Sequence, residues 1–307
     1  MIGLHWFYER SNLGIISEIN LGKNGTKMKS VTLLACLAIL LGTVLTGCVT
    51  TMTNRGNTKE PVVNPDPEHL VWIKPGAFTM GSPATEPDRN TNEGPQMLVT
   101  ISRGFWMSKY ETTQAEYLAV TGANPSLFKG EAQRPVEQVA WSDATNYCAK
   151  LTVRERAAGR LPAGYAYRLP TEAEWEYCCR AGTTTATAFG NSLSSTQANF
   201  DGNFPYGGAA QGPNLKTTTL VGSYAPNAWG LYDMHGNVYE WCLDWDDSYP
   251  GGSVSDPQGP ASGADRILRG GCWYSYGIYC RAANRGDYWP GHGNGDVGFR
   301  PVLAPDQ

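Results

Sequence analysis

The stretch from Gly182 to the C-terminus is the feature that most constrains the fold. It contains almost no long segment with helical or strand periodicity, and Asn, Asp, Gly and Pro recur throughout it. Loops of this length inside a compact domain must be held in place, and calcium, disulfide bonds or stacked aromatic rings could each do so. The 36 glycines and 20 prolines of the chain indicate irregular backbone, whereas its 10 tryptophans and 16 tyrosines indicate buried aromatic surface. We therefore predict a single loop-rich domain.

Regular structure is predicted mainly before this stretch. Capping boxes begin two short helices at Thr113 and Thr171, because each threonine is followed three residues later by glutamate. A third helix is predicted from Ser142 to Gly159, where apolar residues repeat at helical spacing. Strand-like runs occupy 71–81, in two halves joined by a Pro-Gly turn, and then 97–101 and 104–107. Short helices with many short strands indicate an α+β fold with one core.

Within the irregular stretch, Gly230–Trp245 has the most unusual composition. It is interpreted as a turn-rich, buried loop, since neither helical nor strand periodicity is present. Asp233, Gly236, Asn237 and Glu240 offer the mix of carboxylate, amide and backbone oxygen that calcium prefers. The alternative is a hydrogen-bonded loop without metal, packed beneath the large aromatic residues Tyr239, Trp241 and Trp245.

The N-terminal region predicts export. A basic flank, the apolar run 31–45 and the sequence Leu-Thr-Gly-Cys ending at Cys48 follow in that order, which resembles the signal and lipobox of bacterial lipoproteins. We expect Cys48 to be lipidated, and the protein to reside on the periplasmic face of the membrane or at the outer membrane or cell surface. The predicted divisions are 1–27, an extension from a mis-assigned start; 28–47, the signal peptide; 48–68, a flexible tether; and 69–303, the folded domain.

Several function classes lack support in the sequence. A net charge of −4 with 17% charged residues offers no basic patch, so no nucleic-acid partner is expected. His235 and His292 are too few and too scattered for a zinc or non-haem iron site. Glu174 is explained by the helix cap, and Glu172 and Glu176 are assigned to a solvated helix face. No phosphate-binding loop or catalytic triad is visible.

Five short sequence blocks occur over about Leu70–Val302, which is the whole predicted domain. In chain order they are Pro75-Gly76-x-Phe78-x-Met80-Gly81, Arg168-Leu169-Pro170-Thr171-Glu172-Ala173-Glu174-Trp175-Glu176, Gly236-Asn237-Val238-x-Glu240-Trp241, Arg269-Gly270-Gly271 and Gly298-Phe299-Arg300. Together and in this order they resemble the formylglycine-generating enzyme, or sulfatase-modifying factor, family. The resemblance implies a variant of the C-type-lectin fold, α+β with little regular secondary structure.

The resemblance also implies a structural calcium ion in the Gly230–Trp245 loop. Matched by position, its ligands are the side chains of Asp233 and Glu240 and the backbone carbonyls of Gly236 and Val238. A second family calcium site would begin at Asn199 and Phe200, and its later carboxylate falls at Pro213 or Asn214 in this chain.

The chemistry of the family depends on two cysteines that bind copper(I) shortly after the Arg-Gly-Gly block. The first corresponds to Ser275 here, and the loop that would carry the second is shorter, so the copper pair is expected to be missing. Cys272 stands where the enzymes have a serine that helps to bind oxygen, and Tyr239 stands where they have a tryptophan. Cys272 and Cys280 are the remaining catalytic candidates, as a substitute pair, although in an exported protein disulfide bonding is the favoured interpretation.

The disulfide candidates also follow from the resemblance. Cys179 matches a family disulfide cysteine whose partner would lie at Ala282, so the neighbouring Cys280 is the expected partner. Cys242 with Cys272 is a second candidate pair. The partner of Cys148 is replaced by Pro301, so that thiol is expected to be free.

Three functions remain open from the sequence. The first is an oxygen-dependent sulfatase-maturing oxidase, which the family favours and the missing cysteines oppose. The second is a related exported enzyme of different chemistry, like the pyoverdine-maturation members. The third is a cell-envelope scaffold that binds a protein or a glycan, and a member without formylglycine-generating activity is favoured. Fold alone does not decide between them.

Overall fold

The computed structural model describes residues 69–306. The predicted extension, signal peptide, lipidated Cys48 and tether all lie outside the described residues. None of the helices in residues 69–306 combines the length and the apolar character needed to cross a membrane.

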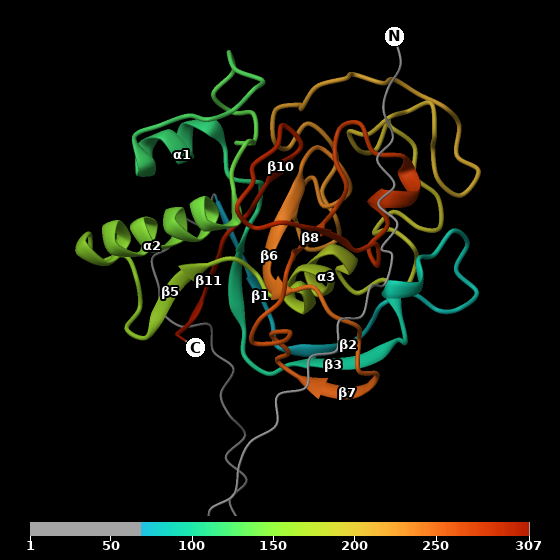
Figure 1. Cartoon of the computed structure of the whole chain (residues 1–307), viewed down its shortest axis with the longest axis horizontal. Helices are drawn as coiled ribbons and strands as arrows, with labels where there is room; N and C mark the ends of the chain where they lie inside the picture. Colours follow the sequence, from blue (N-terminus) through green and yellow to red (C-terminus); the bar gives the residue numbers. More distant parts are fainter. Residues whose placement is uncertain (1–68, 307) are drawn as a thin grey trace, which may run out of the picture. The chain divides into compact units, whose positions relative to one another are not determined.

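Three α-helices and eleven short strands form the domain, with two single-turn 3-10 helices. In chain order they are β1 (Leu70–Ile73), β2 (Gly76–Met80), a 3-10 turn (Thr91–Glu93), β3 (Met97–Ile101), β4 (Phe105–Ser108), α1 (Gln114–Thr121), α2 (Trp141–Ala157), β5 (Tyr165–Arg168), α3 (Glu172–Arg180), β6 (Tyr239–Trp245), β7 (Gly252–Ser255), β8 (Arg266–Arg269), a second 3-10 turn (Gly277–Cys280), β9 (Gly286–Tyr288), β10 (Val297–Gly298) and β11 (Val302–Pro305). The architecture is α+β with long irregular connections, as the sequence predicts (Figure 1).

The strands form three small sheets. Their orders are β1-β4-β11-β5, β10-β6-β8-β9 and β2-β3-β7. The first sheet joins both ends of the domain, because β11 pairs with β4 and β5 in antiparallel fashion. In the second sheet β6 pairs antiparallel with β8 and parallel with β10, so the loop before β6 and the segment after β8 are brought to one place.

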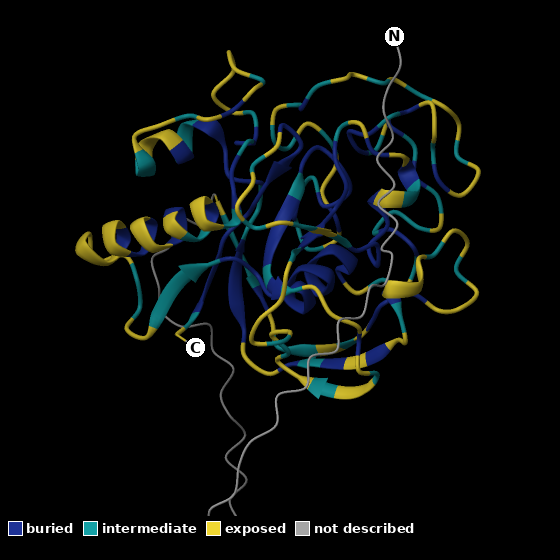
Figure 2. Ribbon diagram, viewed as in Figure 1, coloured by how far each residue is buried: buried dark blue, intermediate teal, exposed yellow. Residues whose placement is uncertain are grey.

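The buried core lies around α3 and β6. Every residue of α3 is buried, whereas α2 buries one face and exposes the other (Figure 2). Both predicted capping boxes are present: Thr113 accepts from the Glu116 amide, and Thr171 accepts from the Glu174 amide. These short polar caps satisfy amides that would otherwise lack partners at the helix starts.

Two expectations about strands need correction. The two halves of 71–81 are strands, but they lie in different sheets and do not form a hairpin. The stretch Gly230–Trp245 is irregular only in its first half, because Tyr239–Trp245 is β6, the longest strand described. β6 is central in its sheet and both its faces carry buried residues, so the alternation that marks a half-exposed strand is absent.

The assignment of Glu172 and Glu176 to a solvated face is wrong. They are 3% and 0% exposed, and each is paired with buried arginine. Arg285 Nε donates to Glu172 at 2.6 Å, while Arg269 donates to Glu176, which also accepts from Arg180. α3 therefore projects carboxylates into the core, where guanidinium groups satisfy them.

Candidate functional site

The segment Cys272–Cys280, between β8 and β9, alternates between the interior and the surface. Its thiols and Ser275 are buried, whereas Tyr274, Tyr276 and Tyr279 are 48%, 40% and 39% exposed. Gly270 and Gly271 before it have φ of 96° and 78°, a conformation that favours glycine and turns the chain out of β8. The segment thus presents an inner polar cluster and an outer aromatic surface.

The inner cluster joins the residues that the sequence comparison singled out. Cys272 Sγ lies 3.2 Å from Ser275 Oγ, which also accepts from the Cys272 amide at 3.0 Å. Ser275 Oγ in turn donates to the Tyr239 hydroxyl at 3.5 Å. The structure therefore brings together Tyr239, Cys272 and Ser275, the three residues that the resemblance matches to functional positions of the family.

Asp296 completes this cluster and was not identified from the sequence. Its Oδ2 accepts from the Tyr274 hydroxyl at 2.7 Å and from the Cys272 thiol at 3.8 Å, while Oδ1 is buried without a partner among the described residues. Burial raises the pKa of the Asp296 carboxyl. No motif marks this residue, because it lies in a Gly- and Asn-rich turn and reaches the cluster only through the pairing of β10 with β6.

The electrostatics of the cluster keep its thiol protonated. Burial, reinforced by the nearby Asp296 carboxylate, raises the pKa of Cys272 to about 12. Burial also raises the pKa of the Tyr239 hydroxyl and of the Cys280 thiol. Copper(I) and sulfur nucleophilic chemistry both need thiolate, so this environment opposes them.

The expected disulfides are not formed in the structure. All six cysteines within residues 69–306 are free and buried, Cys148 among them. His235 contacts two of them: its Nδ1 is 2.7 Å from the Cys280 carbonyl, and the Cys179 sulfur lies 3.8 Å from Nε2. The pairings of Cys179 with Cys280 and of Cys242 with Cys272 stay predictions.

Both ring nitrogens of His235 contact backbone groups. Its Nε2 accepts from the Ala188 amide at 3.0 Å, so the proton resides on Nδ1, which donates to Cys280. Burial lowers the pKa of this histidine to about 4.

The outer surface is a row of aromatic rings. Phe204, which is 47% exposed, packs on Tyr276 with ring centroids 4.1 Å apart, and Tyr276 lies 6.1 Å from Tyr279. The backbone fixes this arrangement, because the Gly277 amide donates to the Phe204 carbonyl. We call Phe204, Tyr276 and Tyr279 the aromatic surface.

The loop expected to hold calcium brings its four candidates together, but its carboxylates are engaged. Both oxygens of Glu240 accept from Arg300 at 2.7 Å, and Oε2 also accepts from Trp175 Nε1. Asp233 Oδ2 accepts from the Gly222 amide at 2.6 Å. Glu240 is thus neutralised by a guanidinium, and the donor set at Asp233, Gly236, Val238 and Glu240 fits a calcium ion poorly.

Glu111 is a buried glutamate that no sequence motif marks, and it forms hydrogen bonds with the same loop. Its carboxyl oxygens accept from Asn237 Nδ2 at 2.6 Å and from the Val238 amide at 3.1 Å. Burial and the neighbouring Asp233 and Glu240 raise its pKa well above the usual range. Side-chain and backbone hydrogen bonds therefore hold this loop in place.

The other family calcium position has free oxygen donors. Asn199 Oδ1 and Thr218 Oγ1 are buried and have no partner among the described residues, and Asn199 Nδ2 donates to the Thr217 carbonyl at 2.9 Å. Amide, hydroxyl and carbonyl oxygens are donors that calcium accepts. Residues 69–306 contain no group of three or more His, Cys, Asp or Glu suited to a metal, so this donor set is neutral.

Comparison with known proteins identifies what the fold resembles. Residues 56–305 match the family described as sulfatase-modifying factor enzyme 1-like domain. A formylglycine-generating enzyme from Streptomyces coelicolor is 35% identical over 242 residues, which cover 76% of this chain and 66% of that protein. Treponema denticola variable protein 1 superposes with a TM-score of 0.64 at 29% identity, covering 77% of this chain and 95% of its own. PvdO from Pseudomonas aeruginosa superposes with a TM-score of 0.63 at 31% identity, covering 76% and 93%.

Proposed function

Because the chain belongs to the sulfatase-modifying factor enzyme 1-like family, we propose that it is an exported, lipid-anchored member of that family that binds a protein partner in the cell envelope. The aromatic surface is the proposed contact. The copper-dependent oxidation of a cysteine is not part of this proposal, since Ser275 stands at the first copper position and Cys272 is a protonated thiol.

One observation carries the proposal: the alternation of the segment Cys272–Cys280. The positions that would serve catalysis are turned inward and hydrogen-bonded to one another, while Tyr276 and Tyr279 are exposed. An exposed tyrosine offers a large, rigid contact surface with a polar end, at a low cost in side-chain entropy. Tyrosine is also enriched among the residues that dominate protein interfaces.

The backbone beneath this surface is suited to recognition. Ser275 and Cys280 anchor the segment from inside, and the Asp201 amide donates to the Ser275 carbonyl at 2.9 Å. The rings are thereby held in place before binding, which reduces the ordering cost of association.

Attachment through lipidated Cys48 is part of the proposal, and so is a structural calcium ion. Such an ion would be held by Asn199 Oδ1 with Thr218 Oγ1, because both are buried oxygens without a partner among the described residues. The anchor is tested by Cys48→Ala, which should shift the protein from the membrane fraction to the soluble fraction. An unchanged distribution would contradict lipidation.

The binding role is tested with fluorescently labelled protein and isolated envelopes of the producing cell. We expect saturable binding that falls at least tenfold in Tyr276→Ala with Tyr279→Ala, and remains unchanged in the control Leu118→Ala, an exposed apolar residue of α1. Protease treatment of the envelopes should abolish binding, whereas periodate oxidation of glycans should not. Loss only after periodate would replace the protein partner with a glycan, and equal binding by all variants would refute the aromatic surface.

A second candidate function is the oxygen-dependent sulfatase-maturing oxidase. It is favoured by the 35% identity to the formylglycine-generating enzyme of Streptomyces coelicolor. The cluster of Cys272, Ser275, Tyr239 and Asp296 is the place where such chemistry would occur, although its contacts oppose it.

A further inference from the structure

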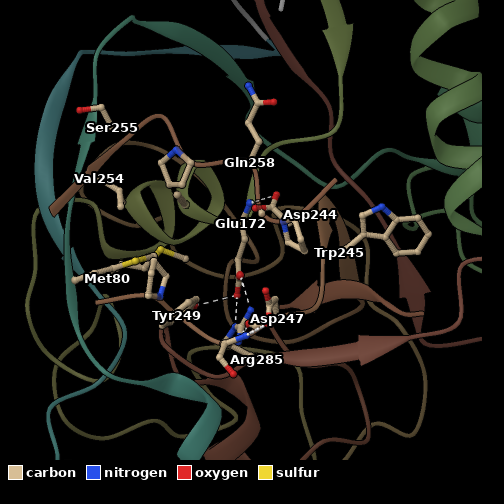
Figure 3. A pocket seen from close by; sticks show the side chains of 17 residues that line it. Met80, Glu172, Asp244, Trp245, Asp247, Tyr249, Val254, Ser255, Gln258 and Arg285 are labelled. Carbon is tan, nitrogen blue, oxygen red and sulfur yellow. Dashed lines mark hydrogen bonds and ion pairs between the residues drawn. The ribbon is translucent and has the colours of Figure 1, made fainter. Parts of the chain in front are cut away.

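A separate cavity lies on another part of the domain, where the start of α3 meets the end of β6, β7 and the loop between β7 and β8. Its volume is about 420 Å³, which is in the range of small-molecule sites. Figure 3 shows Met80 and Val254 on one side, Asp244 on the other, and Glu172 with Arg285 and Tyr249 at its base. None of the residues of the aromatic surface lines this cavity.

Most of the cavity wall is apolar. Met80, Met97 and Val254 come from the β2-β3-β7 sheet, and Ala173 comes from α3. Three prolines continue this wall along the connections that flank β7, at positions 250, 257 and 260. The walls therefore suit the hydrocarbon part of a ligand.

The ion pairs at the base are already satisfied. Glu172 accepts from Arg285 Nε at 2.6 Å and Nη2 at 2.9 Å, and from the Tyr249 hydroxyl at 3.0 Å. Arg285 lies over the Tyr249 ring, 4.2 Å from its centroid. These groups shape the cavity and have little capacity left to bind a charged ligand.

Asp244 differs from Glu172 and Arg285 because its carboxyl forms no ion pair among the described residues. Its Oδ2 accepts from the Glu172 amide at 2.8 Å, and it takes part in no ion pair within residues 69–306. Its Oδ1 has no hydrogen-bond partner there and lies beside Gly259, which also lines the cavity. The residue as a whole is only 5% exposed, and its unpartnered oxygen lies beside the cavity.

None of the described cations near Asp244 forms an ion pair with it. The cations near it are engaged elsewhere: Arg168 with Glu174, Arg285 with Glu172, and Arg266 between the rings of Trp141 and Trp245. Burial, with Glu172 as the next cause, raises the pKa of Asp244 to about 8. The titratable and charged groups that face it are Glu172, Glu174, Arg168, Arg266, Arg285 and Cys242.

We propose that this cavity binds a small organic cation, an ammonium group on an apolar chain. Asp244 holds the ammonium group, and the chain packs against Met80, Met97 and Val254. Ser248, Ser255 and Gln258 line the cavity and offer oxygens for the remaining ammonium hydrogens. On binding, Asp244 loses its proton to the solvent and forms the ion pair that the fold itself does not provide.

Calorimetric titration of the full chain with n-hexylammonium tests this proposal, with 1-hexanol and hexanoate as neutral and anionic analogues. We expect the ammonium to bind at least tenfold more tightly than the alcohol, and the anion not to bind. Because Asp244 must ionise, affinity should rise by about fifty-fold between pH 6 and pH 8, and buffers of different ionisation enthalpy should reveal proton release.

Two variants complete the test. Asp244→Asn keeps an oxygen for the Glu172 amide and should remove the preference for ammonium, while Val254→Phe should fill the cavity and weaken both ligands. Near-ultraviolet circular dichroism establishes that each variant is folded. Equal binding of ammonium and alcohol to the wild type, unchanged ammonium binding in Asp244→Asn, or no binding at millimolar concentration would overturn the proposal. Envelope binding through the aromatic surface does not depend on any of these results.

Discussion

The substitution Asp244→Asn should stabilise the domain in a strongly pH-dependent way. Asp244 has a pKa of about 8 in the folded chain, compared with 3.8 for an ordinary aspartate, because it is buried beside Glu172. A carboxyl group whose pKa is raised by folding binds its proton more tightly in the folded state. Its ionisation therefore costs nothing below pH 3.8, destabilises the fold increasingly between pH 3.8 and 8, and reaches a constant penalty above pH 8.

The size of the effect follows from the same two pKa values. Each unit corresponds to about 1.4 kcal/mol, so the difference between 3.8 and about 8 gives an upper value of about 6 kcal/mol at pH 9 and about 3 kcal/mol at pH 6. Asparagine keeps the acceptor for the Glu172 amide and removes the charge. The variant should therefore be more stable than the wild type at pH 9 and nearly equal to it at pH 4.

The assay is guanidinium unfolding of both proteins at several values between pH 4 and pH 9, with Glu131→Gln at an exposed carboxylate as the control substitution. The difference between Asp244→Asn and wild type should grow with pH, while the control difference should stay flat. Parallel stability profiles for Asp244→Asn and wild type, or a variant that is least stable at high pH, would refute the reasoning about this buried carboxyl group.

Three further predictions concern the buried ion pairs, calcium and the cysteines. Arg300→Met should destabilise the domain by about 3–5 kcal/mol in the same unfolding assay, because it leaves the Glu240 carboxylate buried and uncompensated; a loss below about 1 kcal/mol, as for an exposed pair, would contradict this. Chelation should lower the melting temperature of the wild type but not of Asn199→Ala, and an equal response in both would remove calcium from that position. In the native chain the six thiols of residues 69–306 should not react with a thiol reagent at pH 8, since they are buried and burial raises the pKa of Cys272 to about 12. In guanidinium without reductant all six should react, and fewer would indicate disulfide bonds.

The local elements were predictable because their determinants are local. Thr113 and Thr171 begin helices through a glutamate three residues later, and the structure contains both capping boxes. β6 was missed because a strand with both faces buried lacks period-two alternation. The fold class was predictable from the family blocks, which are spread over the whole domain.

The site residues were predictable only at positions that match functional positions of the family. Tyr239, Cys272 and Ser275 were identified in this way, and in the structure they contact one another. Asp296 and Asp244 could not be identified, because each reaches its site through tertiary packing and neither carries a motif. The carboxylates of α3 were misassigned for the same reason: their arginine partners lie in distant segments of the chain.

The most direct test of the account is oxygen-dependent conversion of a synthetic peptide containing the sequence Cys-x-Pro-x-Arg by the purified full chain loaded with copper(I). The inward-facing, protonated Cys272 and the serine at position 275 predict no conversion beyond that of copper alone, measured as the mass change from cysteine to formylglycine. Catalytic turnover that requires the protein and is lost in Cys272→Ala would contradict the proposed binding role and establish an oxidase.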